Sequence, residues 1–120
     1  MLVLNNIINN KMKANSLKSS NKIDETELST CLNEIALNQD RKAFSNIFKY
    51  FAPRLKSFFV KLGCTEMQAE EIIQEVMIAV WTKSHTYNQD KSSVSTWIYT
   101  IAKNKRIDKI RKEKKHFVVD

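Results

Sequence analysis

Turn-forming residues are scarce in this sequence of 120 residues. It contains one glycine, Gly63, and one proline, Pro53. Tight turns use glycine and proline more than most residues, so their scarcity disfavours a fold of many short strands. Together with the long periodic apolar stretches described below, it predicts an all-α fold.

Cysteine is scarce as well. Cys31 and Cys64 form neither a CxxC pair nor a zinc motif with histidine, and we expect both to be reduced thiols in the core or at its boundary. The sequence also lacks a glycine-rich phosphate loop, a cluster of metal ligands, and a nucleophilic side chain with a general base at a recognisable spacing. We therefore expect a protein that is not an enzyme, with no catalytic residue, metal or cofactor.

Long apolar runs are missing too. No stretch approaches the ~18 consecutive apolar residues of a transmembrane helix, so we expect no membrane span. Asparagines interrupt the apolar residues of positions 2–8, which does not fit an ordered signal peptide. The expected location is the cytoplasm.

The chain is expected to form one domain after an N-terminal arm. Residues 1–22 are rich in Asn, Lys and Ser, which predicts a disordered arm. Apolar periodicity predicts helices over about 25–38, from Asp40 onward, over 65–83, and from Ser93 or Ser95 to about Lys115. We expect a compact bundle of about four helices over residues 23–116, followed by a frayed or truncated end at 117–120.

Local signals mark where these helices begin. Asp24 and Asp40 can accept hydrogen bonds from the first backbone amides of the helices that follow them. Thr65 and Gln68 have the spacing of a capping box. Pro53 falls inside the apolar pattern of the second helix and is expected to kink or end it.

Charge is distributed in blocks. The net charge is +7, but residues 23–40 and 64–82 are acidic, whereas residues 41–63 and 103–115 are basic. This alternation predicts separate surfaces for separate partners rather than one uniformly basic surface.

The helix expected over 65–83 has two different faces. At about 100° per residue, the face predicted to be core comprises Ala69, Ile73, Val76, Met77 and Val80. The opposite face is an acidic stripe with one isoleucine, comprising Glu71, Gln74, Glu75 and Ile78. Periodicity alone leaves two interpretations of this stripe open: a solvated face, or a docking face for a basic partner.

The last helix and the loop before it form a second candidate surface. The helix is predicted to bury Val94, Trp97, Ile98, Ile101 and Ala102. Other side chains are expected to point away from that buried side, namely Thr96, Tyr99, Thr100, Lys103 and Arg106. The loop supplies groups that can hydrogen-bond a base edge, including Tyr87, Asn88, Gln89, Asp90, Ser92 and Ser93. Phosphate contacts are predicted from the basic residues Lys103, Lys105, Arg106 and Lys109.

Three segments together resemble region 2 of the sigma-70 family, the initiation factors of bacterial RNA polymerase. They are AFSNIFKYFAPRLKSFFVKLG from Ala43, EEIIQEVMIAVW from Glu70, and WIYTIAKNKRID from Trp97. The sequence is most similar to the extracytoplasmic-function (ECF) group, and the resemblance covers about residues 24–116. It implies an all-α fold of the region 2 type.

The resemblance also implies two partners. In the family, the third helix grips a coiled coil of the polymerase β′ subunit, and the matching contact positions are Glu71, Gln74, Glu75 and Ile78. The loop and last helix of the family recognise the non-template strand of the −10 promoter element as the DNA opens. The matching DNA-binding positions are Tyr87, Asn88, Gln89, Asp90, Ser92, Ser93, Thr96, Tyr99, Thr100, Lys103, Arg106 and Lys109.

Two departures from the family keep alternatives open. Thr96-Trp97 stands where primary sigma factors carry adjacent tryptophans, as in most of the ECF group, and this implies weaker DNA melting. Nothing in residues 1–120 resembles the helix-turn-helix domain that recognises the −35 element. The alternative is therefore a truncated interaction module that binds polymerase or an anti-sigma factor without unaided promoter activity. A basic DNA-binding protein unrelated to polymerase is disfavoured, because the acidic stripe would repel DNA.

Overall fold

The computed structural model describes residues 23–119, with side chains described as far as Lys115. Its elements are α2 (Glu25–Asn38), α3 (Arg41–Lys61), α4 (Glu66–Lys83), the 3₁₀ turn η1 (Ser84–Thr86) and α5 (Val94–Val119). The described residues contain four α-helices and no strand, which confirms the all-α prediction. The arm expected over 1–22 lies outside the described residues.

The helices begin where the local signals predicted. The Asp24 carboxylate accepts a hydrogen bond from the Glu27 amide at 2.9 Å, and the Asp40 carboxylate accepts from the amides that open α3. At the start of α4, the Thr65 hydroxyl accepts from the Gln68 amide at 3.1 Å, and the Gln68 side chain accepts from the Thr65 amide at 2.9 Å. The predicted capping box is confirmed.

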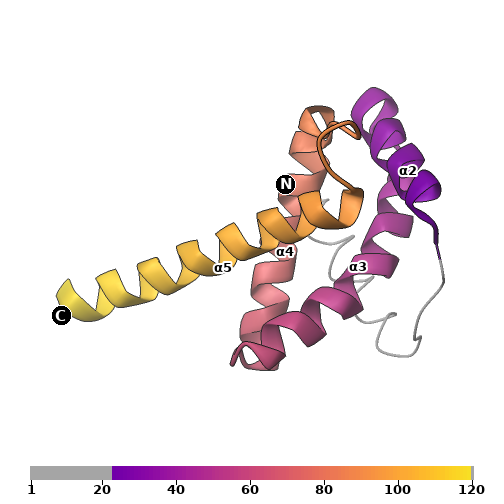
Figure 1. Cartoon of the computed structure of the whole chain (residues 1–120). Helices are drawn as coiled ribbons and strands as arrows, with labels where there is room; N and C mark the ends of the chain where they lie inside the picture. The colour runs from indigo at the N-terminus through magenta and orange to yellow at the C-terminus, as the bar shows by residue number, and fades with distance from the viewer. Residues whose placement is uncertain (1–22, 120) are drawn as a thin grey trace.

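Proline does not end α3. The helix continues through Pro53 to Lys61, and Figure 1 shows that its axis bends along its length. Its C-terminal end is closed at Gly63, which has a φ of 102°. That left-handed backbone suits glycine and reverses the chain into α4.

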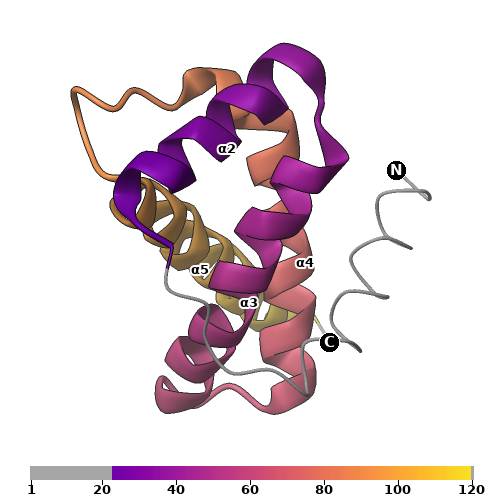
Figure 2. The ribbon, with the colours of Figure 1, turned by 90° about the vertical axis from the view of Figure 1, so that its right-hand side faces the viewer.

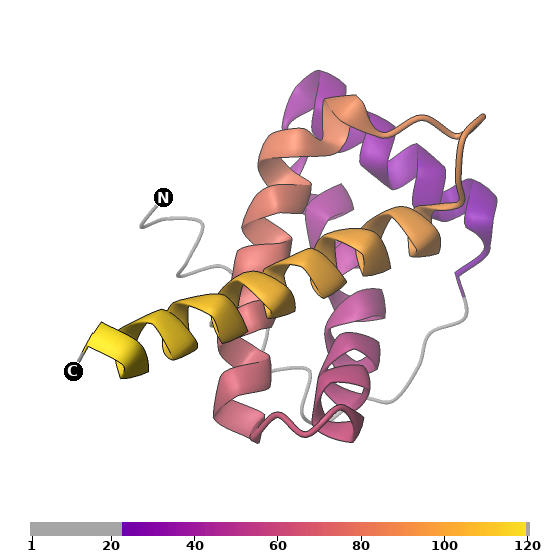
Figure 3. The same cartoon turned by 60° about the vertical axis from the view of Figure 1, so that its left-hand side comes forward.

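The core lies between α2, α3 and α4, and α5 closes it. Figure 2 shows α2, α3 and α4 on the near side with α5 behind them. Figure 3 shows α5 crossing α4 and then extending beyond the bundle. The largest fully buried side chains include four phenylalanines of α3, namely Phe44, Phe48, Phe51 and Phe59. The first part of α5 contributes Val94, Ile98 and Ala102 to this core.

Candidate functional site

The acidic stripe of α4 lies on the side of the helix opposite the core. All five residues predicted as core on α4 are buried, and Ile72 and Ala79 on one flank are buried with them. Glu71 is exposed, whereas Gln74, Glu75 and Ile78 are half-buried. Ile78 also packs against the core. The stripe is therefore partly sheltered by neighbouring groups rather than fully solvated.

α5 covers one flank of this stripe. The Lys109 ammonium donates to the Glu71 carboxylate at 2.6 Å. That hydrogen bond raises the pKa of Lys109 above its ordinary value. Glu75 lies close by, lining a surface hollow with Lys109, Lys112 and Glu113. The four predicted polymerase contacts therefore share α4, and one of them is paired with a predicted DNA contact.

Two predicted outward positions of α5 turn inward. Arg106 was expected to point away from the buried side, but its guanidinium reaches the Leu62 carbonyl at 3.5 Å, and its Nε is buried with no hydrogen-bond partner among the described residues. Tyr99 packs edge-on against Phe58 at 5.2 Å, and burial raises the pKa of its phenol. The helix turn places positions 99 and 106 on the flank nearest α3, which corrects the expectation for both.

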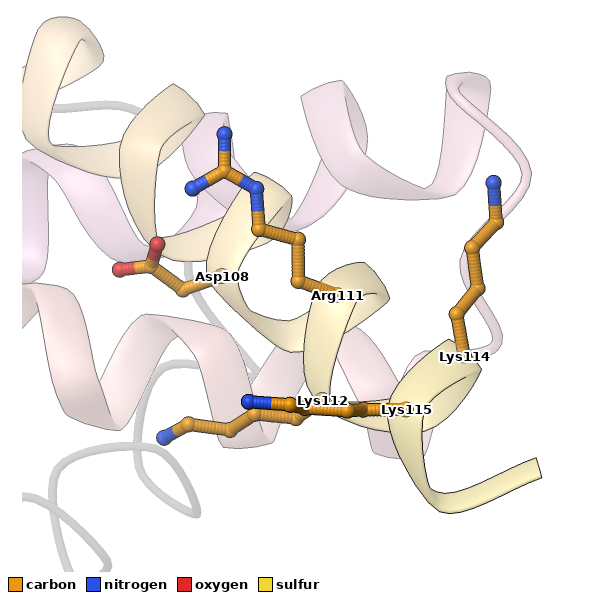
Figure 4. A pocket seen from close by; sticks show the side chains of 5 residues that line it. All are labelled: Asp108, Arg111, Lys112, Lys114 and Lys115. Atoms are coloured by element: carbon orange, nitrogen blue, oxygen red, sulfur yellow. The ribbon is translucent and has the colours of Figure 1, made fainter. Parts of the chain in front are cut away.

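The remaining outward positions of α5 are exposed as predicted. They are Thr96, Thr100 and Lys103. Trp97 is half-buried and packs against the core, as expected from the apolar pattern. Exposed basic side chains continue beyond them, and Arg111 and Lys114 extend from one side of the helix while Lys112 and Lys115 extend from another (Figure 4). Asp108 is the acidic neighbour of these four basic residues in one surface hollow.

The loop before α5 is held at both ends. The Tyr87 hydroxyl donates to the Ser92 carbonyl at 3.0 Å, and its ring packs against Trp97 at 5.6 Å. At the helix start, the Ser93 hydroxyl accepts from the Thr96 amide at 3.1 Å. Between these ends, the side chains of Asn88, Gln89 and Asp90 are exposed.

An open polar hollow of about 540 Å³ lies between this loop and α2. The predicted residues on its loop side are Tyr87, Gln89, Asp90, Ser92 and Ser93. Its other side is formed by residues that sequence patterns did not identify, namely Glu25, Thr26, Ser29, Thr30 and Asn33. No local signal could identify them, because α2 and the loop are far apart in the sequence and come together only in the folded chain. The contact between the Ser29 and Tyr87 hydroxyls, for example, joins residues 58 positions apart.

No group of three or more His, Cys, Asp or Glu side chains comes together among the described residues in an arrangement that could hold a metal ion. None of the described helices combines the length and the apolar character needed to cross a bilayer. Cys31 and Cys64 are both half-buried free thiols, as expected, and burial raises the pKa of Cys31.

The sequence itself matches a known family. Residues 47–116 match the family described as Sigma-70 region 2. The chain belongs to the sigma-70 family. The match includes α4, the loop and α5 to His116, and so contains both candidate surfaces apart from the α2 side of the hollow.

Similar proteins place this sigma-70 region 2 chain in the ECF group. It is 42% identical over 95 residues to the ECF RNA polymerase sigma factor RpoE of Cereibacter sphaeroides, covering 79% of the chain and 52% of that relative. It is 30% identical over 81 residues to the ECF RNA polymerase sigma factor SigW of Bacillus subtilis, covering 68% of the chain and 43% of that relative. The chain thus spans about half the length of the curated relatives it matches.

The fold is also similar to a solved structure. Rhodobacter sphaeroides SigE, solved in complex with the anti-sigma ChrR, superposes with a TM-score of 0.69 at 43% identity. The match covers 75% of this chain and 55% of that chain. The region 2 fold expected from the resemblance is therefore confirmed.

Proposed function

We propose that this sigma-70 region 2 domain binds core bacterial RNA polymerase and recognises the −10 promoter element as the DNA opens. The observation that carries the proposal is the family match over residues 47–116. The structure supports it by presenting two polar surfaces of different character outside one packed core. The proposed activity is non-enzymatic, and its place is the bacterial cytoplasm, where core polymerase acts.

The proposed polymerase surface is the stripe of α4. Glu71 and Glu75 supply negative charge, Gln74 supplies a polar amide, and Ile78 supplies an apolar contact. Complementary charge steers a basic partner and fixes its orientation more than it adds affinity. We assign the β′ coiled coil to this stripe because the family uses the matching positions for that contact.

The proposed DNA surface is the loop, the hollow beside it and the outer face of α5. Holding a flipped base costs a few kcal/mol of unstacking, which a pocket and stacking must offset. The hollow offers hydroxyl, amide and carboxylate groups for a base edge, while Lys103 and the exposed cations beyond it can contact phosphates. Such phosphate contacts give affinity and salt dependence but no sequence selectivity. Arg106 and Lys109 stay in the proposed DNA-binding set, but we expect them to contribute less to DNA binding, because their side chains contact other parts of this chain.

A second candidate function is an interaction module. The chain spans about half of its curated relatives, and the similar SigE structure holds an anti-sigma protein. A region 2 domain of this kind would bind polymerase or an anti-sigma factor without starting transcription unaided.

Run-off transcription distinguishes these functions. The purified chain is combined with bacterial core polymerase on genomic DNA fragments, with core polymerase alone as the control. Discrete new transcripts are expected if recognition of the −10 element suffices. Co-elution with core polymerase without transcripts would support the interaction module, and the absence of both would contradict the proposed polymerase surface.

A further inference from the structure

One carboxylate joins three separate segments beside the proposed DNA hollow. Glu25 Oε2 accepts a hydrogen bond from the Val94 amide at 2.8 Å, although the two residues are 69 positions apart. The same oxygen lies 3.4 Å from the Tyr87 hydroxyl and 3.4 Å from the Ser29 hydroxyl. Glu25 thus connects the start of α2 to both ends of the loop.

The contact with Val94 fixes where α5 begins. The first amides of a helix have no partner within the helix and need acceptors from elsewhere. The Ser93 hydroxyl accepts a hydrogen bond from the nearby Thr96 amide, whereas the Val94 amide donates to the carboxylate of the distant Glu25. A negative group at a helix N-terminus is also favoured by the helix dipole.

The contact with Tyr87 fixes the other end of the loop. The Tyr87 hydroxyl lies among the Ser92 carbonyl, Glu25 and Ser29, at 3.0 to 3.5 Å. Exposed Gln89 and Asp90, which line the hollow, lie between Tyr87 and Val94, the two points that contact Glu25. Their placement at the hollow therefore depends on this carboxylate.

We propose that Glu25 is a positioning residue that sets the base preference of the hollow. The inference rests on the proposed function. Glu25 acts as a hydrogen-bond acceptor that holds the loop, and it does not itself select the base. Its carboxylate and that of Asp90 both line the hollow, so negative charge disfavours a phosphate there, whereas a neutral nucleobase meets no such repulsion.

The test compares abasic DNA substrates one position at a time. The full chain and core polymerase are bound to a fluorescent fork whose single-stranded segment carries the −10 element, with one base removed in each substrate. The wild-type chain should lose affinity at the one or two positions whose bases enter the hollow, by the roughly five- to 150-fold that good base contacts provide. Other positions should change little.

Three variants separate positioning from other roles. In Glu25→Ala, removing a base from the fork should weaken binding by no more than about threefold at any position. Affinity for the abasic forks and for core polymerase should stay at the wild-type level. Glu25→Gln keeps an acceptor oxygen and should retain the base preference. Glu27→Ala removes an exposed carboxylate from the same turn of α2 and is the matched control for charge, with no change expected.

Several outcomes would overturn the role of Glu25. If Glu25→Ala kept the full base preference, the position of the loop would not depend on Glu25. If Glu25→Gln and Glu25→Ala lost the preference equally, the negative charge of Glu25 would matter rather than its ability to accept hydrogen bonds. If Glu25→Ala fails to fold by circular dichroism, Tyr87→Phe replaces it, and unchanged preference there would contradict the anchoring. A wild-type chain with no position-dependent loss would instead contradict the DNA-binding hollow itself, and the role of Glu25 with it.

Discussion

Lys109 Nζ lies 2.6 Å from Glu71 Oε2, so that α5 reaches across to the acidic stripe of α4. Lys109 belongs to the surface proposed for DNA and Glu71 to the surface proposed for polymerase. Their side chains are 22% and 52% exposed, which leaves the pair open to competition by an incoming basic partner. The two proposed surfaces are therefore joined by one ion pair.

Removing Lys109 should strengthen polymerase binding. In Lys109→Met, a basic group of the partner no longer has to displace an internal lysine from Glu71. Partly exposed pairs contribute about 0.2–1 kcal/mol, so we expect a gain in affinity of about 1.5- to fivefold, measured by competition binding to core polymerase. Lys103→Met, on the outer face of the same helix, is the control and should change nothing. A loss of affinity in Lys109→Met would show that Lys109 itself contributes to docking.

The same pair predicts how stability depends on pH. Its hydrogen bond to Glu71 raises the pKa of Lys109 in the folded chain above the ordinary value of 10.5. The folded state then binds the proton more tightly than the unfolded state, so the stabilisation is complete below pH 10.5 and is lost as pH rises through the raised value. The difference in melting temperature between wild type and Lys109→Met should thus stay constant from neutral pH to about pH 10.5 and shrink as the pH rises through the raised pKa of Lys109. A difference that persists in strong base would contradict the ion pair.

The double variant Gln74→Ala/Glu75→Ala tests the stripe directly. Neither side chain belongs to the buried core, so the double variant should still fold as a helical bundle, which circular dichroism checks. We expect core polymerase affinity to fall about tenfold or more, which corresponds to about 1.4 kcal/mol. Gel-filtration co-elution and titration measure the effect. Glu66→Ala removes an exposed carboxylate from the first turn of the same helix and should bind normally; equal weakening in both would point to net charge rather than to this stripe.

Local sequence signals predicted the helices well because each signal acts within a few residues. The aspartate caps and the Thr65–Gln68 box sit three residues or fewer from the amides they serve. Contacts between distant segments could not be predicted in this way. Arg106 meets Leu62 across 44 positions and Lys109 meets Glu71 across 38. Long basic side chains can lay their stems along apolar surface and direct their charge elsewhere, so charge alone did not show which way they point.

This difference in direction predicts unequal effects on DNA binding. Lys103 is exposed on the outer face of α5, whereas Arg106 is directed toward the α3–α4 turn. Lys103→Ala should weaken DNA binding equally for all sequences and lower the salt slope by about one. Arg106→Ala should leave the slope nearly unchanged. Binding titrations over a range of salt concentrations measure both, and a decrease in slope of about one in Arg106→Ala would place its guanidinium on DNA.

Gly63 offers a test of the turn that sets α4 against α3. Its φ of 102° is a conformation that side chains disfavour, although a Cβ there would meet no atom within 4 Å. Gly63→Ala should therefore destabilise the fold through backbone strain rather than through a clash, by about 1–2 kcal/mol. Each kcal/mol lowers the melting temperature of a domain of this size by roughly 4–8 °C. Gly63→Asn should lose less, because asparagine tolerates left-handed backbone better. Because the stripe of α4 lies outside this turn, both variants should still bind core polymerase at low temperature. Equal melting temperatures for Gly63→Ala and wild type would contradict the left-handed turn.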